Sequence, residues 1–318
     1  LFHLGESVLR EGNPARAAAT WERAFAWYRT RRLLPEYELY VKLGRVLRDR
    51  LGRPEAACAV FREAFARYPD RVHLLIELSG VHALCGRPRE ARRLVRQAIR
   101  LAKKHYMKIP SWVDRDAAVV LRWRLKDPRA ALAHLEKAVR RHPDEPFLRM
   151  QAAYAWNDLG RHDRAVAAAL QALEQYERMT DPGHRTHYHY LAALLQDRLG
   201  DHARALVWLR RAEAKYPGDA ETHLRLARAP ETTGDPAGRA RHLREYINIT
   251  VIREQVPPLA VYTALAELYR TTLKQPEEAR LVLEEGLRFF GKEPGLHLLL
   301  GQVREELGRN TEALAAYR

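Results

Sequence analysis

The chain has 318 residues, of which 47% are hydrophobic and 30% are charged, and its formal net charge at pH 7 is +15. This balance excludes an intrinsically disordered chain and is typical of a folded, helix-rich protein. No apolar stretch reaches the roughly 18 residues of a membrane-spanning helix, so the sequence predicts no insertion into a membrane.

The positive charge comes mainly from arginine and has two explanations. A basic surface suits polyanions or acidic proteins, whereas the codons of a GC-rich genome place arginine at neutral surface positions. We favour the second explanation, because the arginines are scattered through every repeat and many stand beside Asp or Glu. Nucleic-acid binding therefore stays an alternative rather than the main expectation.

A small residue recurs along the whole chain at intervals of 34 to 40 residues. The recurring alanines are Ala17, Ala57, Ala91, Ala131, Ala165, Ala205, Ala240, Ala279 and Ala313. In six of the nine copies a glycine stands five residues before the alanine. A small side chain at the same place in every copy lets a neighbouring helix approach closely. The period therefore indicates one supersecondary unit that is stacked many times.

Each repeat is predicted to contain two antiparallel helices, and the second repeat shows the pattern best. Its inward positions recur at three- and four-residue spacing. They are Tyr40, Leu43, Gly44 and Leu47 on the first helix, and Ala57, Phe61, Ala64 and Phe65 on the second. Pro69 closes the repeat. Prolines such as Pro54 and Pro128 mark the first turn of the second helices, where a missing N–H costs nothing.

The order of small, aromatic and proline positions resembles the tetratricopeptide repeat. It is matched by Leu43, Gly44, Gly52, Ala57, Phe61, Ala64 and Pro69, and less fully by Leu300, Gly301, Gly308, Ala313 and Tyr317. The resemblance implies an all-α fold, a right-handed α-solenoid of about eight and a half helix hairpins that spans residues 1–318 as one array. The approximate repeats are 1–36, 37–70, 71–111, 112–144, 145–184, 185–218, 219–257, 258–294 and 295–318. Because TEALAAYR stops within a predicted helix, we expect a fragment of a longer protein.

The intervals between the alanines alternate, which the family pattern does not require. They run 40, 34, 40, 34, 40, 35, 39 and 34 residues, so every odd repeat carries about half a dozen additional residues. We expect these residues to lengthen the second helix by about one and a half turns, so that alternate repeats project along one edge. The seventh repeat departs from the pattern. Pro230 falls inside its first helix, and its second helix, RARHLREYINITVI, is predicted to slip by one frame, which predicts a shortened or kinked pair.

The resemblance also implies a concave wall that is lined by the first helices and usually binds peptides. In the fourth to sixth repeats its positions are apolar and aromatic. The candidate partner-binding residues are Trp123, Phe147, Met150, Tyr154, Asn157, Tyr190, Leu194 and Arg198. Rigid rings bury much area at low entropic cost, and an Asn amide both donates and accepts hydrogen bonds. The alternative is that these side chains pack against neighbouring first helices, or against a segment of the same protein that is missing from this sequence.

Two groups of basic residues are further candidates. Lys42, Arg45 and Arg48 are predicted to form a cationic patch on the wall of the second repeat. Arg31, Arg32, Lys103 and Lys104 lie in the extensions of the first and third repeats, near aromatic residues. Cations at a helix C-terminus also complement the helix dipole, and we favour that simpler explanation for the extensions.

The sequence contains no phosphate-binding loop, nucleophile elbow or HExxH pair, so we predict no enzyme and no cofactor. His184, His187 and His189 in the run HRTHYHY lack a nearby acid that would complete a metal shell, and we predict no metal site. Cys58 and Cys85 are predicted to act as small hydrophobic residues within helices.

Our leading hypothesis for function is a non-catalytic scaffold that holds a protein or peptide segment in its groove and supports assembly of a multiprotein complex. One alternative is an array that binds a polyanion along its arginine-rich edges. Another is the periplasmic repeat region of a bacterial exopolysaccharide-export protein, in which such arrays are similar in composition and length.

Overall fold

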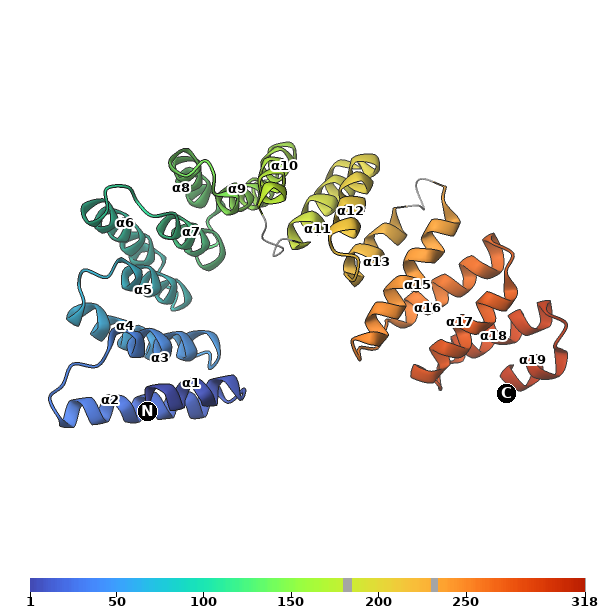
Figure 1. Ribbon diagram of the computed structural model, residues 1–318, viewed down its shortest axis with the longest axis horizontal. Helices are drawn as coiled ribbons and strands as arrows, with labels where there is room; N and C mark the ends of the chain where they lie inside the picture. Colours follow the sequence, from blue (N-terminus) through green and yellow to red (C-terminus); the bar gives the residue numbers. More distant parts are fainter. Residues whose placement is uncertain (180–184, 230–233, 318) are drawn as a thin grey trace. The chain divides into compact units, whose positions relative to one another are not determined.

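The computed structural model describes residues 1–179, 185–229 and 234–317, and these residues form helices and no strand. Clustering of the contacts divides the chain into an N-terminal half, Leu1–Arg178, and a C-terminal half, Met179–Arg318. Each half consists of helices that follow one another as antiparallel hairpins (Figure 1). The predicted all-α fold of stacked hairpins is confirmed.

The N-terminal half contains five hairpins. Its helices are α1 (Phe2–Arg10), α2 (Pro14–Thr30), α3 (Tyr37–Asp49), α4 (Pro54–Arg67), α5 (Val72–Leu84), α6 (Pro88–His105), α7 (Ser111–Val119), the π-helix η1 (Val120–Arg124), α8 (Pro128–Arg141), α9 (Pro146–Asp158) and α10 (His162–Arg178). The odd-numbered helices are the first helices of their hairpins, and α7 continues into η1.

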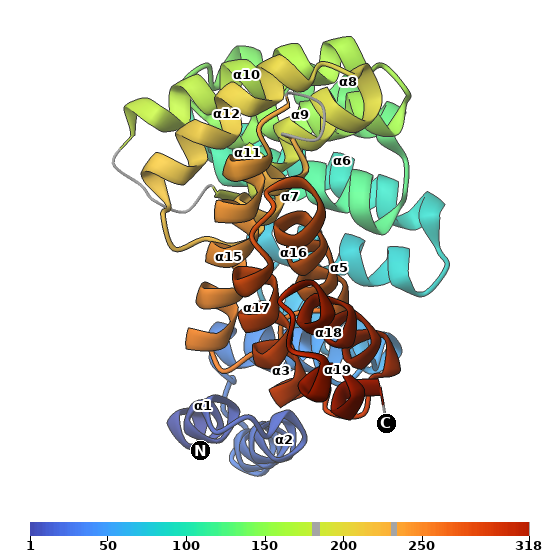
Figure 2. The same ribbon diagram turned by 90° about the vertical axis from the view of Figure 1, so that its right-hand side faces the viewer.

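The described residues of the C-terminal half contain the remaining helices. They are α11 (Arg185–Ala193), the π-helix η2 (Leu194–Arg198), α12 (His202–Lys215), α13 (Ala220–Arg228), α15 (Pro236–Ile252), α16 (Leu259–Glu267), the π-helix η3 (Leu268–Thr272), α17 (Pro276–Phe289), α18 (Pro294–Glu306) and α19 (Asn310–Tyr317). Figure 2 shows α16, α17, α18 and α19 lying one after another, and each of them contacts the next.

Local chemistry fixes where the second helices begin. Several of them start with a proline at the first helical position, as predicted. Asn13, Asp127 and Asp235 each accept a hydrogen bond from the backbone N–H three residues later, at 2.8–3.0 Å. Such caps satisfy donors that have no partner inside the helix and contribute about 1 kcal/mol each.

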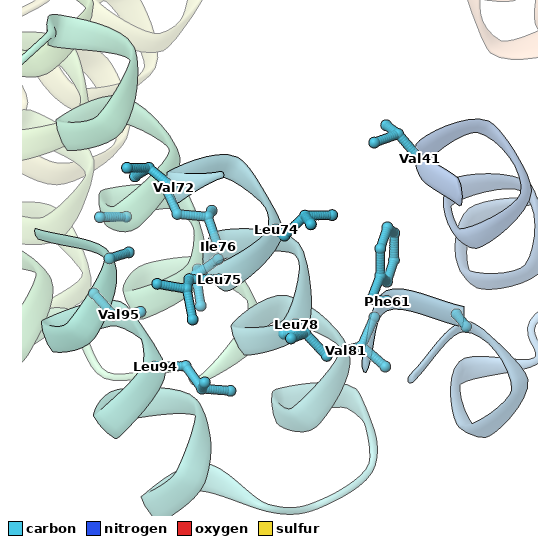
Figure 3. Close-up of a cluster of buried hydrophobic side chains, with 14 of the residues drawn as sticks. Val41, Phe61, Val72, Leu74, Leu75, Ile76, Leu78, Val81, Leu94 and Val95 are labelled. Atoms are coloured by element: carbon cyan, nitrogen blue, oxygen red, sulfur yellow. The ribbon is translucent and has the colours of Figure 1, made fainter. Parts of the chain in front are cut away.

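The hydrophobic core runs from hairpin to hairpin within each half rather than closing around one centre. In the N-terminal half one buried cluster extends from Val8 to Ala155. Figure 3 shows its middle part, where Leu75 of α5 lies on the side of Leu94 and Val95 of α6, and Leu78 of α5 lies on the side of Phe61 of α4. All nine recurring alanines are buried. Each hairpin thus completes its core with residues of its neighbours, as expected for a repeat protein.

The closest helix contacts depend on glycine. A Cβ atom added to Gly44 of α3 would lie 2.4 Å from the ring of Phe61 on α4, and one added to Gly5 would lie 2.2 Å from the ring of Trp21. Both rings are fully buried. The glycine therefore makes room for the ring of the following helix, which explains why the sequence pairs a small residue with an aromatic one in these repeats.

The alternation of long and short repeats is confirmed, with one correction. The second helices α2, α4, α6 and α8 have 17, 14, 18 and 14 residues, and α10, α12, α15 and α17 have 17, 14, 17 and 14. The extension is therefore about one helical turn rather than one and a half. The other additional residues lie in the connection that follows and, in the fourth, sixth and eighth repeats, in the first helix.

Three first helices contain one residue more than first helices such as α3 and α5, and this residue produces a π turn at the end of each. The sequence analysis did not predict these turns. The helices η1, η2 and η3 end the first helices of the fourth, sixth and eighth repeats and recur every 74 residues. The backbone then turns through a residue with positive φ, which is Gly200 after η2. At the equivalent places Lys126 and Lys274 adopt φ of 49° and 55°, although an L side chain disfavours this region.

The seventh repeat is shortened, as predicted, because its first helix α13 has only nine residues. Pro230, which motivated that prediction, lies outside the described residues. The second helix is not shifted, however, since α10, α15 and α19 begin 74 residues apart at His162, Pro236 and Asn310. Only the alanine has moved along the helix. No helix in the described parts of the chain is both long and apolar enough to span a bilayer.

The contact between Gly44 and Phe61 predicts an asymmetry between two glycine substitutions. Gly44→Ala should lower the free energy of unfolding by about 1–3 kcal/mol, because the buried ring has no room to retreat. Gly80→Ala is the matched control, because a Cβ there meets nothing closer than 3.8 Å. Alanine should stabilise that helix by about 0.5–1 kcal/mol relative to glycine. Urea unfolding followed by circular dichroism measures both, and equal effects would show that close packing is not the cause.

Candidate functional site

The first helices of the N-terminal half form a continuous surface. Helix α5 contacts α7 and η1, and α7 contacts α9, so residues on these helices lie next to one another although about 35 residues separate them in sequence. We call this surface the first-helix face. Seven of the fifteen candidate side chains from the sequence analysis lie on it: Lys42, Arg45, Arg48, Trp123, Phe147, Tyr154 and Asn157.

An aromatic cluster lies where η1 meets α9. The guanidinium carbon of Arg122 lies 4.5 Å from the ring centre of Trp123 and 4.8 Å from that of Tyr154. The Nε of Arg122 also donates a hydrogen bond to Asp158 at 2.7 Å. Trp123 stays 60% exposed despite this contact. Arg122 therefore fixes the two rings in place while leaving a large apolar face of Trp123 open to a partner.

Two further candidates flank this cluster on α9. Phe147 is half-buried, and the guanidinium carbon of Arg115 lies 5.7 Å from its ring centre. Asn157 is half-buried as well, and its Oδ1 lies 3.0 Å from Nδ1 of His162. Part of the hydrogen-bonding capacity of Asn157 is thus used inside the protein, and its amide nitrogen is left to meet a ligand.

Two of the predicted partner-binding residues are wrong. Met150 is fully buried, and Leu194 is 3% exposed. Both side chains therefore belong to the buried core, which agrees with the alternative that the sequence left open. Tyr190 is half-buried on α11 and Arg198 is exposed at the end of η2, both in the C-terminal half.

The predicted cationic patch is not a free positive surface, because each of its members is paired with an acid. Lys42 lies 2.8 Å from Glu6, and Arg45 donates to Glu77 at 2.6 Å. Arg48 bonds to Glu77 as well and also lies 2.7 Å from Asp49. Glu6 and Glu77 stand on neighbouring first helices about 30 to 40 residues away in sequence. The pattern within one repeat therefore could not reveal this pairing.

Glu77 is the centre of this network. Its side chain is 8% exposed and accepts hydrogen bonds from two arginines. Burial by itself would raise the pKa of Glu77, but a hydrogen bond from His73 and the charges of Arg48 and Arg45 outweigh it and lower the pKa to about 2. The carboxylate stays ionised at neutral pH and ties α3 to α5.

A cavity of about 380 Å³ opens beside this network on the first-helix face. Its lining comes from three consecutive first helices and alternates charged with apolar side chains: Arg45, Arg48, Asp49, Ile76, Glu77, Gly80, Asp116, Val119, Val120 and Arg124. Arg124 lies 3.3 Å from Asp49 across the cavity. The exposed Trp123 directly precedes Arg124 in sequence, so the cavity and the aromatic cluster adjoin at η1.

A second, larger cavity of about 550 Å³ lies at the start of the same first helices. It is lined by Tyr37, Arg67, Tyr68, Pro69, Asp70, Arg71, Val72, His73, His105, Tyr106 and Trp112. The hydroxyl group of Tyr37 lies 2.8 Å from Nδ1 of His73, and burial raises the pKa of Tyr37 to about 12. The sequence analysis did not predict this cavity.

The basic residues of the extensions are exposed. The guanidinium carbon of Arg31 lies 4.3 Å from the ring centre of Trp27, and Arg32 has a positive φ of 53° at the end of α2. Lys103 and Lys104 occupy the last turn of α6, where their charges complement the helix dipole.

The histidines and cysteines that the sequence analysis considered are the remaining candidates. His189 lies 2.8 Å from the hydroxyl of Thr222 and 2.9 Å from Asp219, whereas His184 lies outside the described residues. Both cysteines are free thiols; Cys58 is buried and Cys85 is half-buried.

The depressed pKa of Glu77 predicts a loss of stability in acid. A carboxyl group whose pKa is lower in the folded state stabilises the fold above its unfolded pKa, and this contribution disappears as the pH falls from about 4.5 towards 2. The difference in unfolding free energy between the wild type and Glu77→Gln should therefore shrink by about 3 kcal/mol between pH 5 and pH 2. Urea titrations at several pH values measure it, and a constant difference would contradict the account.

Comparisons with known proteins agree with this architecture. A family model described as tetratricopeptide repeat matches residues 2–72, 117–182 and 158–220, which together make up more than half of the chain. No curated protein matches the sequence.

Several solved structures align with the chain at low sequence identity, and the one with a TM-score above 0.5 shares its fold. The C-terminal part of the TPR repeat-containing protein from Cytophaga hutchinsonii aligns with a TM-score of 0.60 and 13% identity, over 82% of this chain and 98% of that one. The human IFIT1 dimer with PPP-AAAA aligns with a TM-score of 0.48 and 18% identity, over 96% and 67% of the two chains. The structure of Naa15/Naa10 bound to HypK-THB aligns with a TM-score of 0.49 and 14% identity, over 95% of this chain and 43% of that one. From the repeated hairpins and the match of the family model, we conclude that the chain belongs to the tetratricopeptide repeat family.

Proposed function

We propose that the protein is a non-catalytic scaffold that binds an extended segment of a partner protein along the first-helix face of its N-terminal half. Trp123 is the observation that carries this proposal. A tryptophan that is 60% exposed on a helix next to a cavity is costly to leave in water, and such anchors dominate binding at protein interfaces.

The surroundings of Trp123 suit a peptide better than a small molecule or a polyanion. Arg122 holds the Trp123 ring in one orientation, so little side-chain entropy is lost when a partner covers it. The adjoining cavity is open and lined by alternating charged and apolar groups. A peptide segment with one bulky apolar side chain flanked by polar residues would match both the Trp123 ring and the adjoining cavity.

Pairing of the cations opposes the polyanion alternative on this face. Arg45 and Arg48 are neutralised by Glu77 and Asp49, and Arg122 is neutralised by Asp158. A bound phosphate backbone would have to displace these carboxylates. The affinity for the proposed partner segment should accordingly depend little on salt, whereas affinity for a nucleic acid would fall steeply as salt increases.

Selection of peptides from a displayed library against the intact chain provides the test. Peptides that bind the first-helix face should bind Trp123→Ala at least about tenfold more weakly, because about 1.4 kcal/mol or more of anchor contact is lost. Tyr154→Ala should also weaken binding, because it removes one wall of the Arg122 sandwich.

Trp27→Ala is the matched control. Trp27 is also an exposed tryptophan under an arginine, but it lies on the second helix α2 and lines a different cavity, with Phe2 and Leu39. Binding should survive this substitution. Equal losses for Trp27→Ala and Trp123→Ala, or no loss for either, would remove the first-helix face from consideration. Binding that disappears at moderate salt in all variants would favour the polyanion alternative.

A further inference from the structure

Three ligating side chains converge in the C-terminal half. Glu213 comes from α12, His223 from α13 and His242 from α15. The Nδ1 atoms of the two histidines are 3.2 Å apart. An oxygen of Glu213 lies 3.8 Å from Nδ1 of His223 and 3.6 Å from Nδ1 of His242. All three atoms therefore lie at the corners of a small triangle.

This triangle has the dimensions of a tetrahedral metal site. Zinc binds imidazole nitrogen at about 2.0–2.1 Å and carboxylate oxygen at about 2.0–2.2 Å, so neighbouring ligand atoms in a tetrahedron are about 3.3–3.5 Å apart. The three distances in the structure, 3.2, 3.6 and 3.8 Å, bracket that value. An ion would fit after shifts of a few tenths of an ångström.

The two histidines are enclosed, whereas the glutamate reaches the surface. His223 and His242 are 5% and 6% exposed, and the side chain of Glu213 is 32% exposed. Two neutral imidazoles and one carboxylate can therefore meet an ion in a dry environment. The exposed side of Glu213 leaves a way in for the ion and room for water as a fourth ligand.

A backbone contact fixes the orientation of His223. Its Nε2 lies 2.9 Å from the carbonyl oxygen of Pro217, and because a carbonyl only accepts, Nε2 must carry the proton. The lone pair then resides on Nδ1, which points at His242 and Glu213. Protein metal sites commonly fix a histidine ligand in this way, with its other nitrogen donating to a carbonyl or carboxylate.

The repeat pattern shows that the carbonyl contact does not explain the cluster. His297 stands 74 residues after His223 and makes the same contact, with its Nε2 2.9 Å from the carbonyl oxygen of Gly291. At the places equivalent to Glu213 and His242, however, that repeat has Leu287 and Ala316. The fold therefore uses a histidine here to bind a loop carbonyl, and the two additional ligands are particular to the sixth and seventh repeats.

We propose that Glu213, His223 and His242 form a binding site for a divalent transition metal ion, with zinc as the best fit. Two imidazole nitrogens and one carboxylate oxygen are ligands that zinc accepts readily, and calcium or magnesium would prefer oxygen alone. The site joins α12, α13 and α15. A bound ion would thus link the sixth repeat to the seventh, whose first helix α13 has nine residues.

In the metal-free state, a contact of Arg241 with His242 opposes metal binding. Its Nη2 lies 3.4 Å from Nε2 of His242, and because arginine only donates, this contact places the proton of His242 on Nδ1. Metal binding requires that proton to move to Nε2 or leave. Removal of the Arg241 side chain should therefore tighten metal binding rather than weaken it.

Titration of the chelator-treated full chain with Co²⁺ and Zn²⁺ tests the proposal. Co²⁺ should bind in one equivalent and give the visible absorption of a four-coordinate ion, and Zn²⁺ should displace it. His242→Gln and Glu213→Gln should each weaken Zn²⁺ binding by about 100-fold or more, since even outer contacts of ligands are worth 10- to 100-fold. Arg241→Met should bind more tightly than the wild type, and bound Zn²⁺ should raise the melting temperature.

His297→Gln is the matched control, because it removes the equivalent histidine and the same carbonyl contact without touching the cluster. It should leave the cobalt spectrum and the zinc affinity unchanged. Circular dichroism of each variant without metal shows whether it folds. The proposal is overturned if the wild type gives no four-coordinate cobalt spectrum, if His297→Gln loses as much affinity as His242→Gln, or if folded His242→Gln binds as tightly as the wild type.

Discussion

The whole structure depends on how closely one helix can approach the next. In the N-terminal half one buried cluster runs through successive hairpins, so each hairpin completes its core by packing against its neighbours. The contact of Gly44 with the ring of Phe61 illustrates the requirement, because even one added methyl group would overlap the ring. The same geometry recurs where Gly301 faces Tyr317 at the other end of the chain. Small residues thus set the helix spacing, and everything on the surface follows from it.

The stacking creates sites that no single hairpin contains. The ion-pair network around Glu77 joins α3 to α5, and the sandwich of Trp123, Arg122 and Tyr154 joins η1 to α9. The cluster of Glu213, His223 and His242 joins three helices. In each case the participating residues come from consecutive repeats of the array. Function in this fold is therefore expected at the boundaries between repeats.

The sequence predicted the features that recur and missed those that occur once. Periodic alanines and first-turn prolines revealed the hairpins, and the alternating intervals revealed the longer helices such as α6. The π turn at η1 was not predicted, because one additional residue does not visibly change the hydrophobic pattern of the sequence. The positive φ of Lys126 was not predicted either, because glycine is the residue expected at a position with positive φ.

The candidate site was predictable only in part, because exposure depends on the neighbouring hairpin. Trp123 and Met150 look alike in sequence as large apolar residues on first helices, yet one is exposed and the other is fully buried. Likewise, Arg45 is a free cation within its own repeat and is paired with Glu77 once the next repeat is stacked on it. Residues 30 or more positions apart decide both outcomes, and a single sequence carries no record of such pairs.

The central claim is that the hairpins support one another only through their nearest neighbours. Hydrogen exchange measured by mass spectrometry on Gly44→Ala tests it most directly. Amide protection should fall in α3, α4 and the adjoining helices of the N-terminal half, and it should stay at the wild-type level in α16 to α19. A uniform loss of protection along the whole chain would instead show one cooperative globular core and contradict the account.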